Sequence, residues 1–149
     1  MKQALLLAKK AYLLGEVPIG AVVVHSGEIV GRGYNKREKS QNAIKHAEII
    51  AIEQACKKLN SWRLENCQIF VTLEPCPMCA GAIANARIKE LHYACKEKTS
   101  CDSLCETILS SQRLNHKVEI FFDDKHEEEI SLLLGDFFKD KRKNKKEQV

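Results

Sequence analysis

The sequence has no apolar run long enough to cross a bilayer, for which about 20 consecutive apolar residues are needed. The longest run near its start, residues 4–8, is interrupted by Lys9 and Lys10 and is too short for the core of a secretory signal peptide. Without a secretion signal, the odd number of seven cysteines favours thiols and metal ligands over disulfides. We therefore expect a cytoplasmic protein with no membrane contact.

The sequence also has no internal repeat and no linker rich in proline, glycine or serine. Its 149 residues are 44% apolar and 30% charged, which is typical of a globular protein with one core. We therefore expect a single domain over residues 1–149, with a basic C-terminal tail from about residue 139.

The net positive charge of the chain is concentrated in this tail. Residues 139–149 carry six basic and two acidic side chains, which account for the whole net charge of +4. A basic end suggests a polyanionic partner. The alternative on charge alone is a solvated, frayed end, and both interpretations stay open.

Periodicity and turn residues indicate an α/β protein. Helices are expected at residues 3–14, 46–59, 77–86 and 102–111, and strands at residues 19–24, 28–34, 68–73, 89–94 and 117–122. A last helix has apolar residues at i, i+3, i+4, i+7 and i+8, namely Ile130, Leu133, Leu134, Phe137 and Phe138. Gly31 and Gly33 indicate a bulge or a close backbone approach in the second strand.

After the opening hairpin, strands alternate with helices, whereas residues 35–45 are polar and irregular. This order predicts a three-layer α/β/α sandwich around a five-stranded mixed, mostly parallel sheet. Ligands gather at the carboxyl ends of strands in such sheets.

Two short segments carry the chemistry: His46-Ala47-Glu48 and Pro75-Cys76-Pro77-Met78-Cys79. One imidazole and two thiolates are three zinc ligands, which leaves the fourth tetrahedral position for water. Together with Glu48 as general acid and base, this pattern is the established signature of zinc-dependent deaminases. It predicts one Zn²⁺ per chain, bound by His46, Cys76 and Cys79.

Both segments fall at predicted helix starts, where side chains lean toward one end, so Glu48 and the three ligands could surround one water. Glu48 would move the protons while hydroxide attacks an amidine carbon. A zinc-stabilised binding module without catalysis is an alternative, although it would need the ligands and not Glu48. The other cysteines are more simply core or surface thiols.

Longer segments around these residues resemble the bacterial tRNA-specific adenosine deaminases of the cytidine deaminase superfamily. The matching segments are residues 16–21, 33–35, 46–49, 71–82, 114–116 and 136–138. The resemblance covers nearly the whole chain. It implies a fold of the cytidine deaminase type.

The resemblance also implies hydrolytic deamination of adenosine to inosine at the anticodon wobble position of an arginine tRNA, by a homodimer. It implies that Asn35 hydrogen-bonds the flipped nucleotide. The side chains implied near the anticodon arm are Phe137, Phe138, Lys141 and Arg142. Asn35 could instead be an ordinary turn residue, and the two phenylalanines could form a core helix face. A deaminase of a free base or nucleotide, of the cytosine, guanine or dCMP type, is the alternative function.

The sequence departs from the family pattern in two places. Before His46 the family usually has Asp-Pro-Thr-Ala, and here residues 42–45 are Asn-Ala-Ile-Lys. After the fourth strand the family often has a glycine-rich run, and residues 98–104 are here Lys-Thr-Ser-Cys-Asp-Ser-Leu. The second departure affects the loop expected to contact RNA and leaves the zinc chemistry unchanged.

Overall fold

The computed structural model describes residues 1–97 and 103–147. Five strands form one sheet in the order β2-β1-β3-β4-β5. The strands are β1 (Gly20–His25), β2 (Glu28–Tyr34), β3 (Cys67–Val71), β4 (Glu90–Tyr93) and β5 (Glu119–Phe122). The β1–β2 and β1–β3 pairs are antiparallel, and the β3–β4 and β4–β5 pairs are parallel. The predicted mixed, mostly parallel sheet is confirmed: four strands run in the same direction, and β1 alone runs against both of its neighbours.

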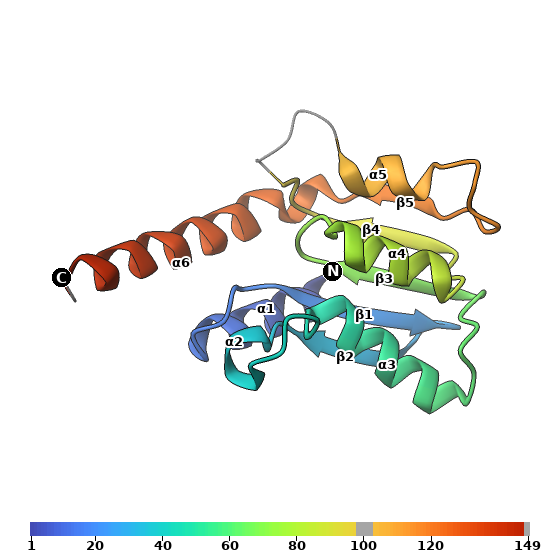
Figure 1. Ribbon diagram of the computed structural model, residues 1–149, viewed down its shortest axis with the longest axis horizontal. Coiled ribbons are helices and arrows are strands. Elements are labelled where there is room, and N and C mark those ends of the chain that lie inside the picture. Colours follow the sequence, from blue (N-terminus) through green and yellow to red (C-terminus); the bar gives the residue numbers. More distant parts are fainter. Residues whose placement is uncertain (98–102, 148–149) are drawn as a thin grey trace.

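Helices cover both faces of this sheet (Figure 1). They are α1 (Lys2–Leu13), α2 (Arg37–Ser40), α3 (Ala47–Leu59), α4 (Pro77–Asn85), α5 (Leu104–Leu109) and α6 (Glu127–Glu147), with a 3-10 turn η1 (Asp124–His126) before α6. The larger core lies under α3, α4 and α5, and a smaller one joins α1 to α6. The three-layer prediction is confirmed.

Small residues let α3 lie directly on β2. A Cβ at Gly31 would lie 2.1 Å from the carbonyl oxygen of Ala51, and one at Gly33 would lie 2.0 Å from that of Ala47. The predicted close backbone approach is therefore present at both glycines. The register also shifts beside Gly31, where Val23 pairs with Gly31 and Val24 pairs with Ile29.

Two of the differences from the predicted elements involve polar residues. β3 ends at Val71, since Thr72 turns to bond Gly20: its Oγ1 accepts from the Gly20 N–H at 3.1 Å. Within residues 35–45, expected to be irregular, the four residues of α2 are helical.

The basic C-terminal segment continues α6 as helix through Glu147. In Figure 1 this helix extends well past the sheet, on the side where α3 and α4 begin. The Tyr12 hydroxyl donates to Asp140 Oδ2 at 2.7 Å and ties the middle of α6 to α1. No described helix is both long and apolar enough to span a membrane.

Candidate active site

The site is built from the first residues of α3 and α4. His46 is the N-cap of α3 in extended backbone conformation, and Glu48 lies in the first turn of that helix. Cys76 is the N-cap of α4, Pro77 is its first residue, and Cys79 follows within its first turn. Proline suits the first helical position because its missing N–H has no helical partner there. Both motif segments thus lie at helix starts, as predicted.

These helix starts bring three metal-ligand side chains together. His46 Nδ1 lies 3.6 Å from Cys76 Sγ and 3.6 Å from Cys79 Sγ. Within residues 1–97 and 103–147, His46, Cys76 and Cys79 are the one group of His, Cys and acidic side chains whose ligand atoms are close enough to hold a metal ion. The two sulfurs come from one turn of α4 and the nitrogen comes from α3, so the cluster bridges two helices.

Glu48 lies buried beside this cluster. Its side chain is 3% exposed, and Oε2 has no hydrogen-bond partner among the described residues. Burial raises the pKa of Glu48 to about 7. A buried carboxylate oxygen without a partner is costly in free energy, so its presence here needs a functional explanation.

The thiols of the cluster differ in protonation. A hydrogen bond with Cys79, reinforced by one with His46, lowers the pKa of the Cys76 thiol to about 4. The same contact with Cys76, together with burial, raises the pKa of Cys79. The hydrogen bond with Cys76 raises the pKa of His46. The lowered pKa of Cys76 favours the thiolate, which is the form of cysteine that binds metals.

Asn35 follows β2 and is 5% exposed. Its Oδ1 accepts from the backbone N–H of Arg37 at 3.2 Å, and its own N–H donates to Ile19 O at 3.1 Å. The amide Nδ2 makes no hydrogen bond among the described residues. Asn35 thus does what a turn residue does and still has a donor available for a ligand.

Two buried carboxylates near the site were not identified from the sequence. Glu16 Oε1 accepts from the Lys39 N–H at 2.6 Å, and Oε2 accepts from the Glu38 N–H at 3.1 Å. Glu74 Oε2 accepts from the Glu97 N–H at 3.1 Å, and its Oε1 accepts from the Ser103 hydroxyl. The available signal was that each glutamate lies in a family segment, Glu74 one residue and Glu16 two residues before a proline, although its partners are remote in sequence.

Of the four C-terminal residues that the resemblance places near the anticodon arm, Phe137 is buried and the other three are exposed. Phe137 is 5% exposed, and its ring meets that of Tyr12 edge-on with the centroids 5.8 Å apart. Phe138 is 46% exposed and lines a cavity of about 330 Å³ with Val17, Leu73 and Lys96 among others. Lys141 and Arg142 are exposed on α6, and Lys141 Nζ lies 5.5 Å from the centre of the Phe137 ring.

Residues 42–45, which differ from the family pattern before His46, form local contacts that hold this turn. Asn42 Oδ1 accepts from the Ile44 N–H at 3.1 Å and so makes the turn that a proline would otherwise favour. Lys45 Nζ lies 3.0 Å from a carboxylate oxygen of Glu53. In the second departure, residues 98–102 lie outside the described residues.

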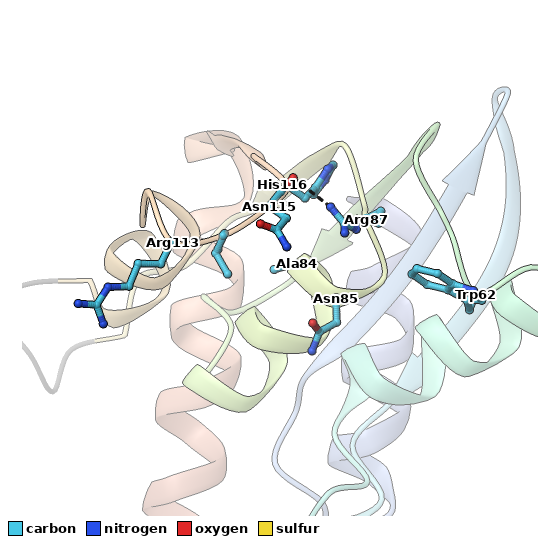
Figure 2. A pocket seen from close by; sticks show the side chains of 8 residues that line it. Trp62, Ala84, Asn85, Arg87, Arg113, Asn115 and His116 are labelled. Carbon is cyan, nitrogen blue, oxygen red and sulfur yellow. Dashed lines mark hydrogen bonds between the residues drawn. The ribbon is translucent and has the colours of Figure 1, made fainter.

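A second hollow, of about 260 Å³, lies at the far end of α4 from the metal-ligand cluster (Figure 2). Arg87, at a positive φ of 60°, donates from Nη1 to Asn115 O at 3.0 Å. His116 Nε2 lies 2.6 Å from Ile88 O. These bonds attach the segment before β5 to the end of α4, which gives the matching residues 114–116 a structural role.

Comparisons with known proteins agree with this geometry. The family model for MafB19-like deaminases matches residues 1–142. The tRNA-specific adenosine deaminase of Bacillus subtilis (strain 168) is 46% identical over 147 residues, which are 98% of this chain and 91% of that protein. The chain belongs to the tRNA-specific adenosine deaminase family. Another member, from Aquifex aeolicus (strain VF5), is 40% identical over 97% of this chain and 95% of its own length.

Solved structures show that the chain has the cytidine deaminase fold of this family. A structure from a study of A-to-I editing by tRNA:A34 deaminases matches with a TM-score of 0.76 and 35% identity, over 83% of this chain and 95% of that one. Guanine deaminase from Bacillus subtilis matches with a TM-score of 0.62 and 42% identity, over 64% of this chain and 61% of that one. The family resemblance seen in the sequence is thereby confirmed.

Proposed function

We propose that this protein is a zinc-dependent hydrolase that converts adenosine to inosine at the anticodon wobble position of tRNA. The observation that carries the proposal is the unpartnered, buried oxygen of Glu48 beside the His46, Cys76 and Cys79 cluster, in a chain of the tRNA-specific adenosine deaminase family. The two tRNA-specific adenosine deaminases that match nearly the whole chain favour this function over deamination of a free base or nucleotide.

The donor set fits zinc. One imidazole and two cysteine sulfurs are ligands that zinc prefers, and three protein ligands are the number found in catalytic zinc sites. His46, Cys76 and Cys79 would hold the ion, and the buried Glu48 Oε2 has no protein partner among the described residues and would be available to a water molecule at the site. When bound, zinc supplies Lewis acidity that lowers the pKa of a water molecule at the site.

Glu48 would carry out the proton transfers. With a pKa raised to about 7, its carboxyl group can both accept and donate a proton near neutral pH. It would accept a proton from the attacking water and deliver it to the ring nitrogen of adenine. It would then accept the proton of the newly added hydroxyl group and donate it to the departing amine. Water adds to the carbon that bears the amine, the C–N bond breaks, and ammonia and inosine are formed.

Substrate binding would use groups around the cluster. We propose that Asn35 donates from Nδ2 to the flipped nucleotide and that Phe138, Lys141 and Arg142 lie along the anticodon arm. Phe137 would act from the core by supporting Lys141. Single-stranded loops are recognised by unstacked bases in pockets and by cations on the backbone. An arginine tRNA and a cytoplasmic location are part of this proposal.

We also propose a homodimer that associates through α4. Gly81 has no atom within 4 Å of the position of a Cβ, and Met78 on the same helix is exposed. A helix with small residues permits the close approach of a second helix. Sedimentation at micromolar concentration tests this assembly, and monomer alone would contradict it.

The function is tested by incubating the purified protein with total bacterial tRNA and measuring new inosine after digestion to nucleosides. A stem-loop with adenosine at the wobble position should be converted, whereas free adenosine, cytosine and guanine should not. The Glu48→Gln variant is the control for contaminating activity. Conversion of a free base with no conversion of the stem-loop would overturn the proposal.

A further inference from the structure

The short helix α2 receives its N-terminal cap from elsewhere in the chain. Its own N-cap residue, Lys36, makes no side-chain capping bond. Instead, Asn35 Oδ1 accepts from the N–H of Arg37, and the two oxygens of Glu16 accept from the N–H groups of Glu38 and Lys39. The first three N–H groups of α2, which have no partner within the helix, are therefore all satisfied by side chains.

The backbone of Glu16 is fixed by the end of α1. It follows α1, where Gly15 has a φ of 76° and the Glu16 N–H donates to Ala11 O at 3.0 Å. The Glu16 side chain is 1% exposed, so water does not replace its two bonds easily. Bonds from N–H groups to a carboxylate are stronger than those between neutral groups.

The segment that Glu16 anchors joins two site residues, because Asn35 lies at one end and His46 at the other. The two ends are closed by a bond from the Lys36 N–H to Lys45 O at 3.0 Å. His46 has a second anchor, since the Ile50 N–H donates to its carbonyl oxygen at 3.1 Å within α3. Asn35, unlike His46, does not lie at the start of a long helix. Its side chain accepts a hydrogen bond from the same turn of α2 that Glu16 caps.

We infer that Glu16 is a positioning residue for substrate binding: its carboxylate fixes the start of α2, and α2 in turn fixes the amide of Asn35 toward the nucleotide. This inference rests on the proposed function. It assigns Glu16 an effect on substrate affinity and none on the proton transfers or on metal binding, because Glu48, Cys76 and Cys79 lie on other elements.

Two variants test this at different strengths. Glu16→Ala removes both acceptors and leaves two N–H groups without partners. Glu16→Gln keeps the size but offers one oxygen and one NH₂ group, so one bond to α2 is replaced by a contact between two donors. Glu28→Gln is the matched control, since Glu28 is an exposed carboxylate at the start of β2.

The measurements are kcat and KM on the wobble stem-loop, zinc content, and amide hydrogen exchange. For Glu16→Ala we expect KM to rise about tenfold, which corresponds to about 1.4 kcal/mol and is near the loss of one hydrogen bond to a charged group. Zinc content should stay at that of the wild type, and kcat should change less than threefold. Exchange should accelerate at the amides of Glu38 and Lys39. Glu16→Gln should show the same pattern to a smaller degree.

An unchanged KM in Glu16→Ala, with an active wild type, would overturn the inference. So would an equal loss of kcat, zinc and thermal stability in both variants, because that pattern indicates a general structural role. If the wild type makes no inosine, the proposed function fails instead. Unchanged exchange at Glu38 and Lys39 in Glu16→Ala would overturn the anchoring itself, whatever the substrate.

Discussion

Replacing Gly33 by alanine should damage both stability and the metal site. A Cβ at Gly33 would lie 2.0 Å from Ala47 O, 2.8 Å from Ala51 N and 3.0 Å from Ala47 C. All three atoms are backbone of α3, so no side chain can rotate out of the way. Ala47 separates the zinc-ligand candidate His46 from Glu48, so any movement of this turn shifts both groups.

The expected size follows from that overlap. The distance between β2 and the first turn of α3 must open by about 1 Å or more, and overpacking of a well-packed core costs about 1–3 kcal/mol. Because the obstacle is backbone, we expect about 3 kcal/mol. In a chain of this length that corresponds to a fall in Tm of about 6–12 °C.

Thermal unfolding and zinc content of Gly33→Ala test this expectation, with Gly135→Ala as control. Gly135 lies inside α6 with nothing within 4 Å of a Cβ, and alanine is favoured over glycine in a helix by up to about 1 kcal/mol. The control should therefore keep or slightly raise Tm. A Gly33→Ala protein with the Tm and zinc content of the wild type would refute the close packing of α3 on β2.

The remaining predictions concern chemistry and RNA. Glu48→Gln should keep zinc and lower kcat by about 10²–10⁴-fold, the usual contribution of a general acid and base, and loss of zinc along with activity would show that Glu48 supports the metal. Cys76→Ser should reduce zinc below one per chain on metal analysis, and an unchanged stoichiometry would contradict its role as a ligand. Changing Lys141 and Arg142 to glutamine should weaken stem-loop binding and reduce the slope of log K against log salt by about 0.7–0.9 per lost phosphate contact, with kcat at saturating RNA unchanged. An unaltered salt slope would mean that these cations are only solvated.

The sequence predicts most of this fold because its elements are strongly patterned. The β-branched run before the first turn gives β1, and the spacing of Ile130, Leu133 and Phe137 gives the buried face of α6. The direction of β1 relative to β3 could not be read from the pattern, since a buried strand has the same composition in either direction. The length of α6 was missed because its last residues are charged and have no apolar periodicity.

The candidate site was easier to predict than its surroundings. The His46, Cys76 and Cys79 cluster, which could hold a metal ion, was recognisable because metal ligands have a few fixed residue types and short spacings. Glu16 and Glu74 act through backbone N–H groups that lie more than 20 residues away. Every residue except proline has a backbone N–H group, so the type of the partner residue is not restricted. The sequence therefore does not reveal which residue the carboxylate binds. Carboxylates of this kind become visible only when burial and hydrogen bonds are known.

The arrangement of the cluster links metal binding to folding. The sulfurs of Cys76 and Cys79 belong to α4, and the nitrogen of His46 belongs to the start of α3, so the ligands meet only when both helices are packed on the sheet. A ligand that binds the folded state alone stabilises it by an amount that grows with the logarithm of its concentration. Substitutions that displace α3, such as Gly33→Ala, should therefore lower metal affinity and stability together. Substitutions that act through α2, such as Glu16→Ala, should leave metal affinity nearly unchanged and alter substrate affinity.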